Sequence, residues 1–338
     1  MNLEQKIAFG GERATQPAVS VVVPCHNEEK NVPVLFAALL KELGQRPYEL
    51  IFVDDGSTDG TLGVLRDLAG RDRGVSYISL SRNFGHQLAL RAGLDAASGD
   101  CVISLDADMQ HPPELIPEML KRWSEGFDVV LTRRRDSART PLFKRLTSGL
   151  YYFVLQKTFG AKIVQGAADF RLLDRAAVEA LREFRDPAPF YRGLIGLIGF
   201  RQTILEYDVG ERLHGQSKYS LRRMVSLARS GIVSSTVLPL RFSFVFSAMF
   251  LLFFLGYAAY VLFIAIFGDS TITGWASVAL LLSLIGFTHS LSLAILSEYV
   301  AQIAMSTRGR PSYIIRERTG GAFADERSHE KDPAWRRG

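Results

Sequence analysis

The sequence predicts an α/β fold with a mainly parallel sheet, followed by a pair of membrane-spanning helices. Over residues 19–132, short apolar runs rich in β-branched residues alternate with amphipathic helical patterns, as in chains of βαβ units. Two long runs without Asp, Glu, Lys or Arg follow nearer the C-terminus. The 338-residue chain is 47% hydrophobic with a formal net charge of +5, so an intrinsically disordered protein is excluded.

Five strands and four helices are expected in the α/β region. The strands are the apolar runs Val19–Pro24, Glu49–Asp54, Val75–Leu80, Cys101–Leu105 and Asp128–Thr132. The helices are the amphipathic segments Val32–Leu43, Thr61–Ala69, Gln87–Ala97 and Pro113–Glu125. Because ligands of open parallel sheets bind at the carboxyl ends of the strands, polar clusters at those ends mark the candidate site.

The two charge-free runs, Phe242–Gly268 and Ser270–Ser297, each exceed the ~20 apolar residues that cross a bilayer. Arginines flank both runs, whereas the connector 268–274 contains neither Lys nor Arg. The positive-inside rule therefore places both flanks in the cytoplasm. Residues 1–17 lack the apolar stretch of a signal peptide. The expected location is the inner (cytoplasmic) membrane, crossed by a two-helix hairpin, with the α/β domain facing the cytoplasm.

Basic amphipathic segments over 142–155 and 221–241 are expected to lie in the plane of the lipid headgroups. The predicted division of the chain is an N-terminal extension (1–16), an α/β domain (17–220), a juxtamembrane amphipathic helix (221–241), two membrane-spanning helices (242–267 and 275–303) and a cytoplasmic C-terminal tail (304–338). Two cysteines, Cys25 and Cys101, are too few for a disulfide framework and lack metal-site spacing.

Polar clusters follow the first two expected strands. His26, Asn27 and Glu28 come after the first, and by themselves they are typical of an ordinary polar turn. Asp54 and Asp55 end the second strand. They indicate either a strand-to-helix turn or carboxylates that accept hydrogen bonds from a ribose hydroxyl or a base N–H of a nucleotide.

A third cluster follows the fourth strand. Asp106 and Asp108 are two residues apart, so on an extended backbone both side chains point to one face. Carboxylate oxygens suit Mg²⁺ or Mn²⁺, and Gln110 offers a third oxygen. This pattern predicts a divalent metal site, with an ordinary loop as the alternative. His111 is more typical of a supporting residue than of a ligand.

Basic residues gather downstream of the fifth strand. They are Arg133–Arg135, Lys144, Arg145, Arg212 and Lys218. Attraction to anionic lipid headgroups is one interpretation, and a phosphate site in which arginine supplies paired donors is the other. A nucleic-acid partner is not expected.

An ordered set of motifs carries a family resemblance over about residues 17–318. The motifs are Pro24-x-x-Asn27-Glu28-Glu29, Asp54-Asp55-Gly56-Ser57-x-Asp59, Asp106-x-Asp108-x-Gln110-x-Pro112-Pro113-Glu114, Asp169-Phe170-Arg171 and Gly215-x-Ser217-Lys218-Tyr219. Together they resemble family-2 glycosyltransferases of the polyisoprenyl-phosphate type, which include dolichol-phosphate mannose synthases and bactoprenol glucosyltransferases. The resemblance implies a GT-A fold, a nucleotide-diphosphate sugar donor, a divalent cation and a polyprenyl phosphate acceptor in the membrane.

The resemblance also implies roles for individual residues. Donor-binding residues would be Pro24, His26, Glu28, Asp54, Asp55, Asp106, Arg212 and Lys218. The metal ligands for Mg²⁺ or Mn²⁺ would be Asp106, Asp108 and Gln110, and the acceptor-phosphate residues Arg133, Lys144, Arg145 and Ser148. Asp108 and Asp169 would be catalytic. The donor is expected to be UDP-glucose or GDP-mannose, and the motifs do not decide between them.

The expected reaction is inverting transfer of a hexose onto a lipid phosphate that is already ionised, so positioning matters more than a general base. A processive polysaccharide synthase is the first alternative, but its Gln-x-x-Arg-Trp motif is absent. A non-catalytic membrane scaffold is the second, although the carboxylate clusters are intact. His289 and Ser290 lie in the second apolar run and could bridge helices in a homo-oligomer.

Overall fold

The computed structural model describes residues 18–134, 164, 166–184, 186, 189–207, 238–267, 274–307 and 311–319. The chain divides into two compact units. One unit comprises residues 1–218 together with 311–338, and the other comprises residues 219–310. Residues 311–319, which follow the second apolar helix in the sequence, therefore belong to the α/β unit.

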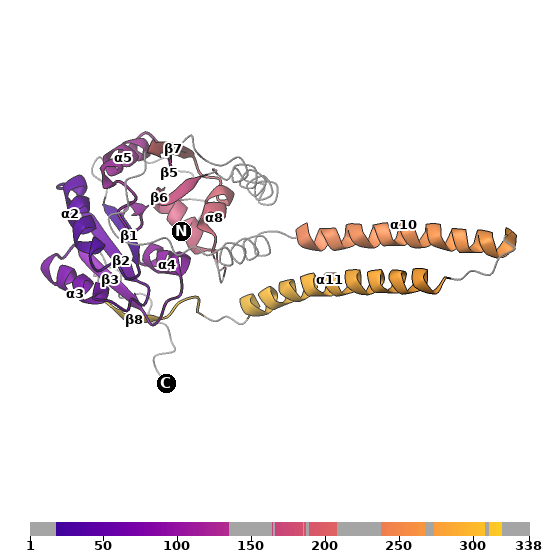
Figure 1. The fold of residues 1–338 in the computed structure, drawn as a ribbon. Coiled ribbons are helices and arrows are strands. Elements are labelled where there is room, and N and C mark those ends of the chain that lie inside the picture. The colour runs from indigo at the N-terminus through magenta and orange to yellow at the C-terminus, as the bar shows by residue number, and fades with distance from the viewer. Residues whose placement is uncertain are drawn as a thin grey trace. The chain divides into compact units, whose positions relative to one another are not determined.

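The α/β unit is built on an eight-stranded sheet in the order β7-β5-β6-β4-β1-β2-β3-β8 (Figure 1). Its strands are β1 (Val19–Cys25), β2 (Tyr48–Asp54), β3 (Val75–Leu80), β4 (Cys101–Ser104), β5 (Val129–Arg134), β6 (Ala167–Asp174), β7 (Gln202–Tyr207) and β8 (Ile315–Arg318). The central strands β4, β1, β2 and β3 are parallel, whereas β6 runs antiparallel to both β4 and β5. The predicted α/β class is confirmed, and each of the five predicted strands is present.

Helices cover both faces of this sheet (Figure 1). They are α2 (Asn31–Leu43), α3 (Thr61–Arg71), α4 (His86–Ala96), the 3-10 turn η1 (Pro113–Leu115), α5 (Ile116–Ser124), α7 (Arg175–Arg182) and α8 (Tyr191–Leu197). Alternation along β1 sends Val21 into a core shared with α2 and α5, and Val22 into a core shared with α4 and α7. Burial on both faces explains why the central strands are apolar throughout.

Helix α4 lies unusually close to the sheet. A Cβ added at Gly93 would stand 2.2 Å from Val22 Cγ1, so only glycine allows this approach. His86 is the first residue of α4, about two turns before Gly93. The close packing therefore fixes the helix that carries this imidazole at the carboxyl edge of the sheet.

Pro24 does not end the first strand, as the sequence suggested, because β1 continues to Cys25. The pairing of β1 with β4 stops at Val22, so Pro24 pairs only with Val53 of β2. A proline at this position removes no ladder hydrogen bond on the β4 side.

The segment after the second apolar helix forms β8, antiparallel to β3 at the edge of the sheet. Arg66 of α3 donates two hydrogen bonds to Glu317, and Tyr313 donates one to Asp95 of α4 at 2.9 Å. Residues 311–319 were predicted to begin the C-terminal tail, whereas the structure makes them part of the α/β unit. β8 was not predicted from the sequence, because a charged strand of four residues at a sheet edge has little apolar pattern.

The second unit contains two long helices, α10 (Leu238–Phe267) and α11 (Trp275–Thr307). Large apolar side chains are exposed on both, among them Leu252 at 71% and Leu282 at 63%. Among the described residues, Leu284–Ala301 is the one stretch long and apolar enough to cross a membrane, and the apolar stretch Ala248–Tyr257 of α10 is shorter. Large exposed apolar surfaces mark contact with a membrane or another protein.

Candidate active site

The polar clusters predicted from the sequence lie at the carboxyl edge of the parallel strands. The loops after β1 and β2 are joined there by reciprocal hydrogen bonds. Asn27, in the left-handed region at φ 59°, accepts a hydrogen bond from Thr58 N at 2.8 Å, and its own N–H donates to Ser57 Oγ at 3.0 Å. His26 is exposed beside them, with Nδ1 2.9 Å from the carbonyl oxygen of Asp55. His26 is thus accessible to a ligand.

Other predicted donor-binding residues support the backbone in this structure. Pro24 is buried within β1, and Glu28 accepts a hydrogen bond from Asn31 at the start of α2. Asp54, 1% exposed, accepts from Ser57 N and Ser79 Oγ, each at 3.0 Å. The structure places Pro24 and Asp54 beneath the surface and Glu28 beside the first residue of α2.

Asp55 ties the loop after β2 to the loop after β3. Its two carboxylate oxygens accept hydrogen bonds from Phe84 N at 2.7 Å and from Gly85 N at 2.9 Å. Burial raises the pKa of Asp55, and these two backbone donors oppose that rise. Gly56 allows the loops to touch, since a Cβ there would stand 2.5 Å from the carbonyl carbon of Arg82. Asp55 therefore positions the backbone that leads directly into His86.

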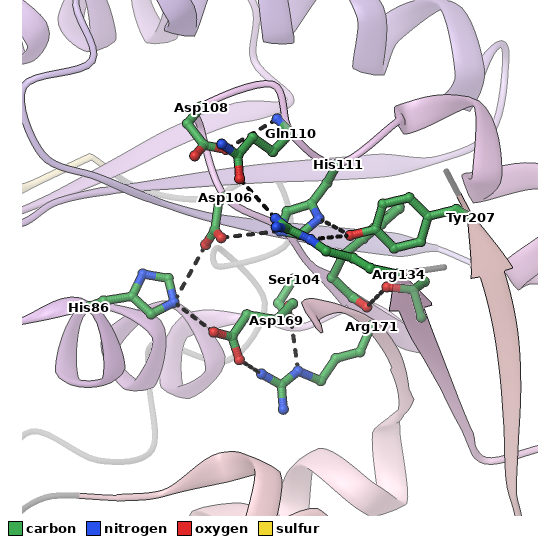
Figure 2. A network of polar contacts seen from close by, with 12 residues as sticks. His86, Ser104, Asp106, Asp108, Gln110, His111, Arg134, Asp169, Arg171 and Tyr207 are labelled. Atoms are coloured by element: carbon green, nitrogen blue, oxygen red, sulfur yellow. Dashed lines mark hydrogen bonds and ion pairs between the residues drawn. The ribbon is translucent and has the colours of Figure 1, made fainter. Parts of the chain in front are cut away.

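Asp106 lies between two imidazoles (Figure 2). His111 Nε2 is 3.1 Å from Asp106 Oδ2, and His111 Nδ1 is 2.9 Å from the Tyr207 hydroxyl. On the other side, His86 Nε2 is 3.5 Å from Asp106 Oδ1. Burial acts to raise the pKa of Asp106, but the His111 hydrogen bond and the nearby His86 hold it below its usual value. Asp106 is thus kept ionised by its neighbours, and His111 is a 2%-exposed supporting residue, as the sequence suggested.

Asp108 and Gln110 lie on the turn that follows Asp106. β4 ends at Ser104 and Met109 has φ 60°, so the loop is not the extended backbone that the sequence analysis assumed. Asp108 Oδ1 accepts a hydrogen bond from Gln110 N at 3.1 Å, while Gln110 Oε1 accepts one from Arg134 at 2.8 Å.

The donor set on this loop fits a hard divalent cation. It offers carboxylate and amide oxygens, and Asp106 Oδ1 is buried without a hydrogen-bond partner. Within the described ranges, no three His, Cys, Asp or Glu side chains converge as a metal cage. Mg²⁺ is commonly held by one or two carboxylates, and water and substrate phosphates complete its shell.

Asp169 of β6 is the centre of a cationic cluster. It forms ion pairs with Arg171, which is 1% exposed, and with Arg192 of α8 at 3.2 Å. His86 Nε2 is 3.7 Å from the same carboxylate. Although burial acts to raise the pKa of Asp169, Arg171 and then Arg192 and His86 lower it well below its usual range. Asp169 is therefore a stable anion, not a group poised to accept a proton.

Two adjacent arginines at the end of β5 separate onto different surfaces. Arg133 forms an ion pair with Glu206 of β7, and both side chains are more than 40% exposed. Arg134 instead points to the site, where it donates to Gln110 and lies 3.4 Å from the Tyr207 hydroxyl (Figure 2). Successive side chains of a strand alternate between faces, so only one of the pair can reach the site. The structure places Arg134, and not the predicted Arg133, beside the carboxylates.

Comparison with known proteins identifies the family. Residues 20–182 match the model of glycosyl transferase family 2. The chain is 38% identical to the uncharacterized glycosyltransferase YkcC of Bacillus subtilis, over 89% of this chain and 94% of that protein. It is 34% identical to the bactoprenol glucosyl transferase of Shigella phage SfII, over 88% and 97% of the two chains. The chain belongs to glycosyltransferase family 2.

This glycosyltransferase also has distant solved relatives. Glucosyl-3-phosphoglycerate synthase from Mycobacterium tuberculosis, crystallised with Mn²⁺, UDP-glucose and phosphoglyceric acid, is 22% identical with a TM-score of 0.46. The alignment covers 64% of this glycosyltransferase and 78% of that enzyme.

Several predicted site residues of the glycosyltransferase lie outside the described residues and stay predictions. They are Lys144, Arg145, Ser148, Arg212 and Lys218. The amphipathic segment 142–155 and residues 221–237 of the juxtamembrane segment also lie outside them.

The structure adds site residues that sequence reasoning missed. His86 begins α4 after the loop 81–85 that follows β3, a position that the strand-end rule predicts to be functional. Tyr207 and Arg192 gave no signal, because they come from β7 and α8, which were not predicted.

Proposed function

We propose that this protein transfers a hexose from a nucleotide-diphosphate sugar to a polyprenyl phosphate at a membrane surface, with inversion at the anomeric carbon. The observation that carries the proposal is the 34% identity to bactoprenol glucosyl transferases over 97% of their length. The match covers 88% of this chain, which is more than the catalytic unit alone, so it extends into residues 219–310. A cluster of ionised carboxylates at the carboxyl edge of the sheet supports it further.

The cation is proposed to be Mg²⁺ or Mn²⁺, held by Asp106, Asp108 and Gln110. When bound, such an ion offsets the charge that develops on the departing nucleoside diphosphate. In the structure Arg134 already donates to Gln110 Oε1 and so stands at the edge of this site. A guanidinium there provides paired donors for a phosphate. We assign Arg134, in place of Arg133, to the acceptor phosphate, with Lys144, Arg145 and Ser148 as further candidates.

The acceptor phosphate needs little help to become a nucleophile. Its second ionisation lies near pH 6, so it is mostly dianionic at neutral pH. Asp169 is held ionised by two arginines and is a weak proton acceptor. Its proposed part is to hold Arg192 and the surrounding polar groups in place, so the rate depends on positioning. We also assign Arg212 and Lys218 to the donor diphosphate, because their positive charges would offset its negative charge.

The two-helix hairpin is proposed to anchor the catalytic unit on the cytoplasmic side of the inner membrane. Arginines flank both apolar helices, while the connector 268–274 has none. An anchored enzyme and a lipid phosphate are both confined to the membrane surface, which brings them together. The exposed apolar side chains of α10 and α11 would supply the anchor.

The test is a donor screen with purified full-length protein in nanodiscs containing undecaprenyl phosphate. UDP-glucose and GDP-mannose are supplied separately, with Mg²⁺, Mn²⁺ or excess chelator, and the glycolipid is identified by mass spectrometry. The expected result is one polyprenyl-phosphate hexose that requires a cation. Chain elongation to a polysaccharide would favour the processive alternative. No transfer from any nucleotide sugar, with native folding verified, would contradict the proposal.

A further inference from the structure

A small group of polar atoms at the centre of the site is left unsatisfied. His86 Nε2 lies 3.5 Å from Asp106 Oδ1 and 3.7 Å from Asp169 Oδ2, both too far for a good hydrogen bond. His86 Nε2 and Asp106 Oδ1 are buried, and neither has a hydrogen-bond partner. Buried polar atoms in native proteins are nearly always satisfied, so an exception inside a site needs an explanation.

The carboxylates of Asp106 and Asp169 are already held by other groups. His111 fixes the second oxygen of Asp106 at 3.1 Å. Arg171 and Arg192 hold the two oxygens of Asp169. The imidazole comes from the first residue of α4, which packs tightly on the sheet through Gly93. The side chains of His86, Asp106 and Asp169 point toward one another and form a small polar cup within the candidate site (Figure 2).

The chemistry of this cup selects its ligand. The carboxylates of this cup are not free to bind a phosphate, because Asp106 is a proposed metal ligand and Asp169 is already paired with Arg171 and Arg192. A hydroxyl suits it well, because its single O–H can donate to a carboxylate while its oxygen accepts from an imidazole N–H. His86 Nε2 is 3.5 Å from Asp106 Oδ1 and 3.7 Å from Asp169 Oδ2. A hydroxyl oxygen placed above these three atoms can lie at hydrogen-bond distance from each of them.

We propose that a hydroxyl group of the transferred hexose binds between His86 Nε2 and Asp169 Oδ2, beside Asp106, and that His86 is a residue that determines sugar selectivity. The proposal rests on the proposed function, since it assumes a nucleotide-hexose donor. It assigns to Asp169 a contact with the sugar in addition to its ion pairs. A hexose that lacks this hydroxyl, or presents it in the other configuration, leaves the buried polar atoms unpaired.

The first test separates the sugar from the nucleotide by equilibrium binding to the full-length protein. UDP and UDP-glucose, and in parallel GDP and GDP-mannose, are titrated with Mg²⁺ into wild type and His86→Ala. The variant is expected to bind the free nucleotide as wild type does and the preferred nucleotide sugar about 10- to 100-fold more weakly, as for a lost hydrogen bond to a charged group. His86→Gln, whose amide nitrogen can reach the position of Nε2, is expected to retain most of that affinity, whereas the shorter His86→Asn is not.

The second test identifies the hydroxyl. Donors deoxygenated at single positions of the preferred hexose are compared by kcat/KM in wild type and His86→Ala. One deoxy donor is expected to be about 10-fold or more poorer in wild type, yet nearly equal to the parent sugar in the variant. A purely structural role of His86 would lower all donors alike and would overturn the inference.

Failure of the inference differs from failure of the proposed function. If wild type forms the glycolipid and His86→Ala discriminates among donors as wild type does, the hydroxyl subsite is wrong and the transferase assignment stands. If wild type forms no glycolipid from any nucleotide sugar, the proposed function fails and the inference that rests on it fails as well.

Discussion

The ion pair between Asp169 and Arg171 provides a direct test of how the site is held together. Arg171 is 1% exposed and Asp169 has 14% of its side chain exposed, so both charges are largely withdrawn from water. Asp169→Asn leaves the guanidinium buried without its counter-charge. Removing one partner of such a pair costs about 3–5 kcal/mol. In a domain of this size, 1 kcal/mol shifts the midpoint of thermal unfolding by about 2–4 °C, so we expect a fall of roughly 6–20 °C.

The measurement is thermal unfolding of the ligand-free, full-length protein in detergent, followed by near-UV circular dichroism. Arg192→Gln is the matched control, because this arginine pairs with the same carboxylate but is 36% exposed. An exposed pair contributes under about 1 kcal/mol. The double variant Asp169→Leu with Arg171→Met removes both charges and is expected to recover much of the loss. Equal midpoints for Asp169→Asn and Arg192→Gln would refute the reasoning.

The pH dependence of this effect has a definite sign. The arginines hold the folded-state pKa of Asp169 below its unfolded value, which is about 4. The carboxylate therefore stabilises the folded state fully above about pH 4, and this contribution is lost as the pH falls below that value. The gap in unfolding midpoint between wild type and Asp169→Asn should be constant from pH 8 to 5 and should narrow below pH 4.

Three further predictions concern the metal loop, the packing of α4 and a buried thiol. Asp108→Asn should abolish glycolipid formation while membrane insertion and thermal midpoint stay near wild type; retained transfer would contradict the metal role. Gly93→Val should destabilise the protein by about 1–3 kcal/mol in thermal unfolding, because a Cβ there would meet Val22 Cγ1 at 2.2 Å. An unchanged unfolding midpoint would argue against the close approach of α4 to the sheet. Burial raises the pKa of the Cys25 thiol well above its ordinary value. Cys25 should therefore resist iodoacetamide at pH 8 until the protein is unfolded. Rapid labelling of Cys25 in the native protein, located by peptide mass spectrometry, would be the contrary result.

The central part of the fold could be predicted from the sequence because its signals are local. β1 to β4 are buried on both faces, so each reads as a continuous apolar run, and α2 to α5 alternate with them. β6 was missed although it is well buried, because its Asp169 and Arg171 interrupt the apolar run and satisfy each other only in the folded state. β8 was missed because its pairing with β3 joins residues more than 200 positions apart, which no local pattern encodes.

The candidate site divides in the same way. Asp106 and the supporting His111 could be placed after the fourth strand from the sequence alone. His86 and Tyr207 could not, since His86 begins α4 and Tyr207 ends β7, from which it contacts His111. The choice between Arg133 and Arg134 was also beyond the motifs. It depends on the alternation of side chains along β5, which turns Arg133 to Glu206 and Arg134 to Gln110. The spacing in the sequence locates this basic cluster to within one residue, and the alternation along β5 decides which arginine faces the candidate site.

The electrostatics of the site bear on how its chemistry can work. A general base must have a pKa near the working pH to accept a proton efficiently. Arg171, Arg192 and the nearby His86 move the pKa of Asp169 in the opposite direction. This arrangement would be counterproductive if the acceptor were an alcohol, whose proton must be removed. It is compatible with an acceptor phosphate that is already ionised at neutral pH. The ionised Asp169 is therefore compatible with the oxyanion acceptor that we propose.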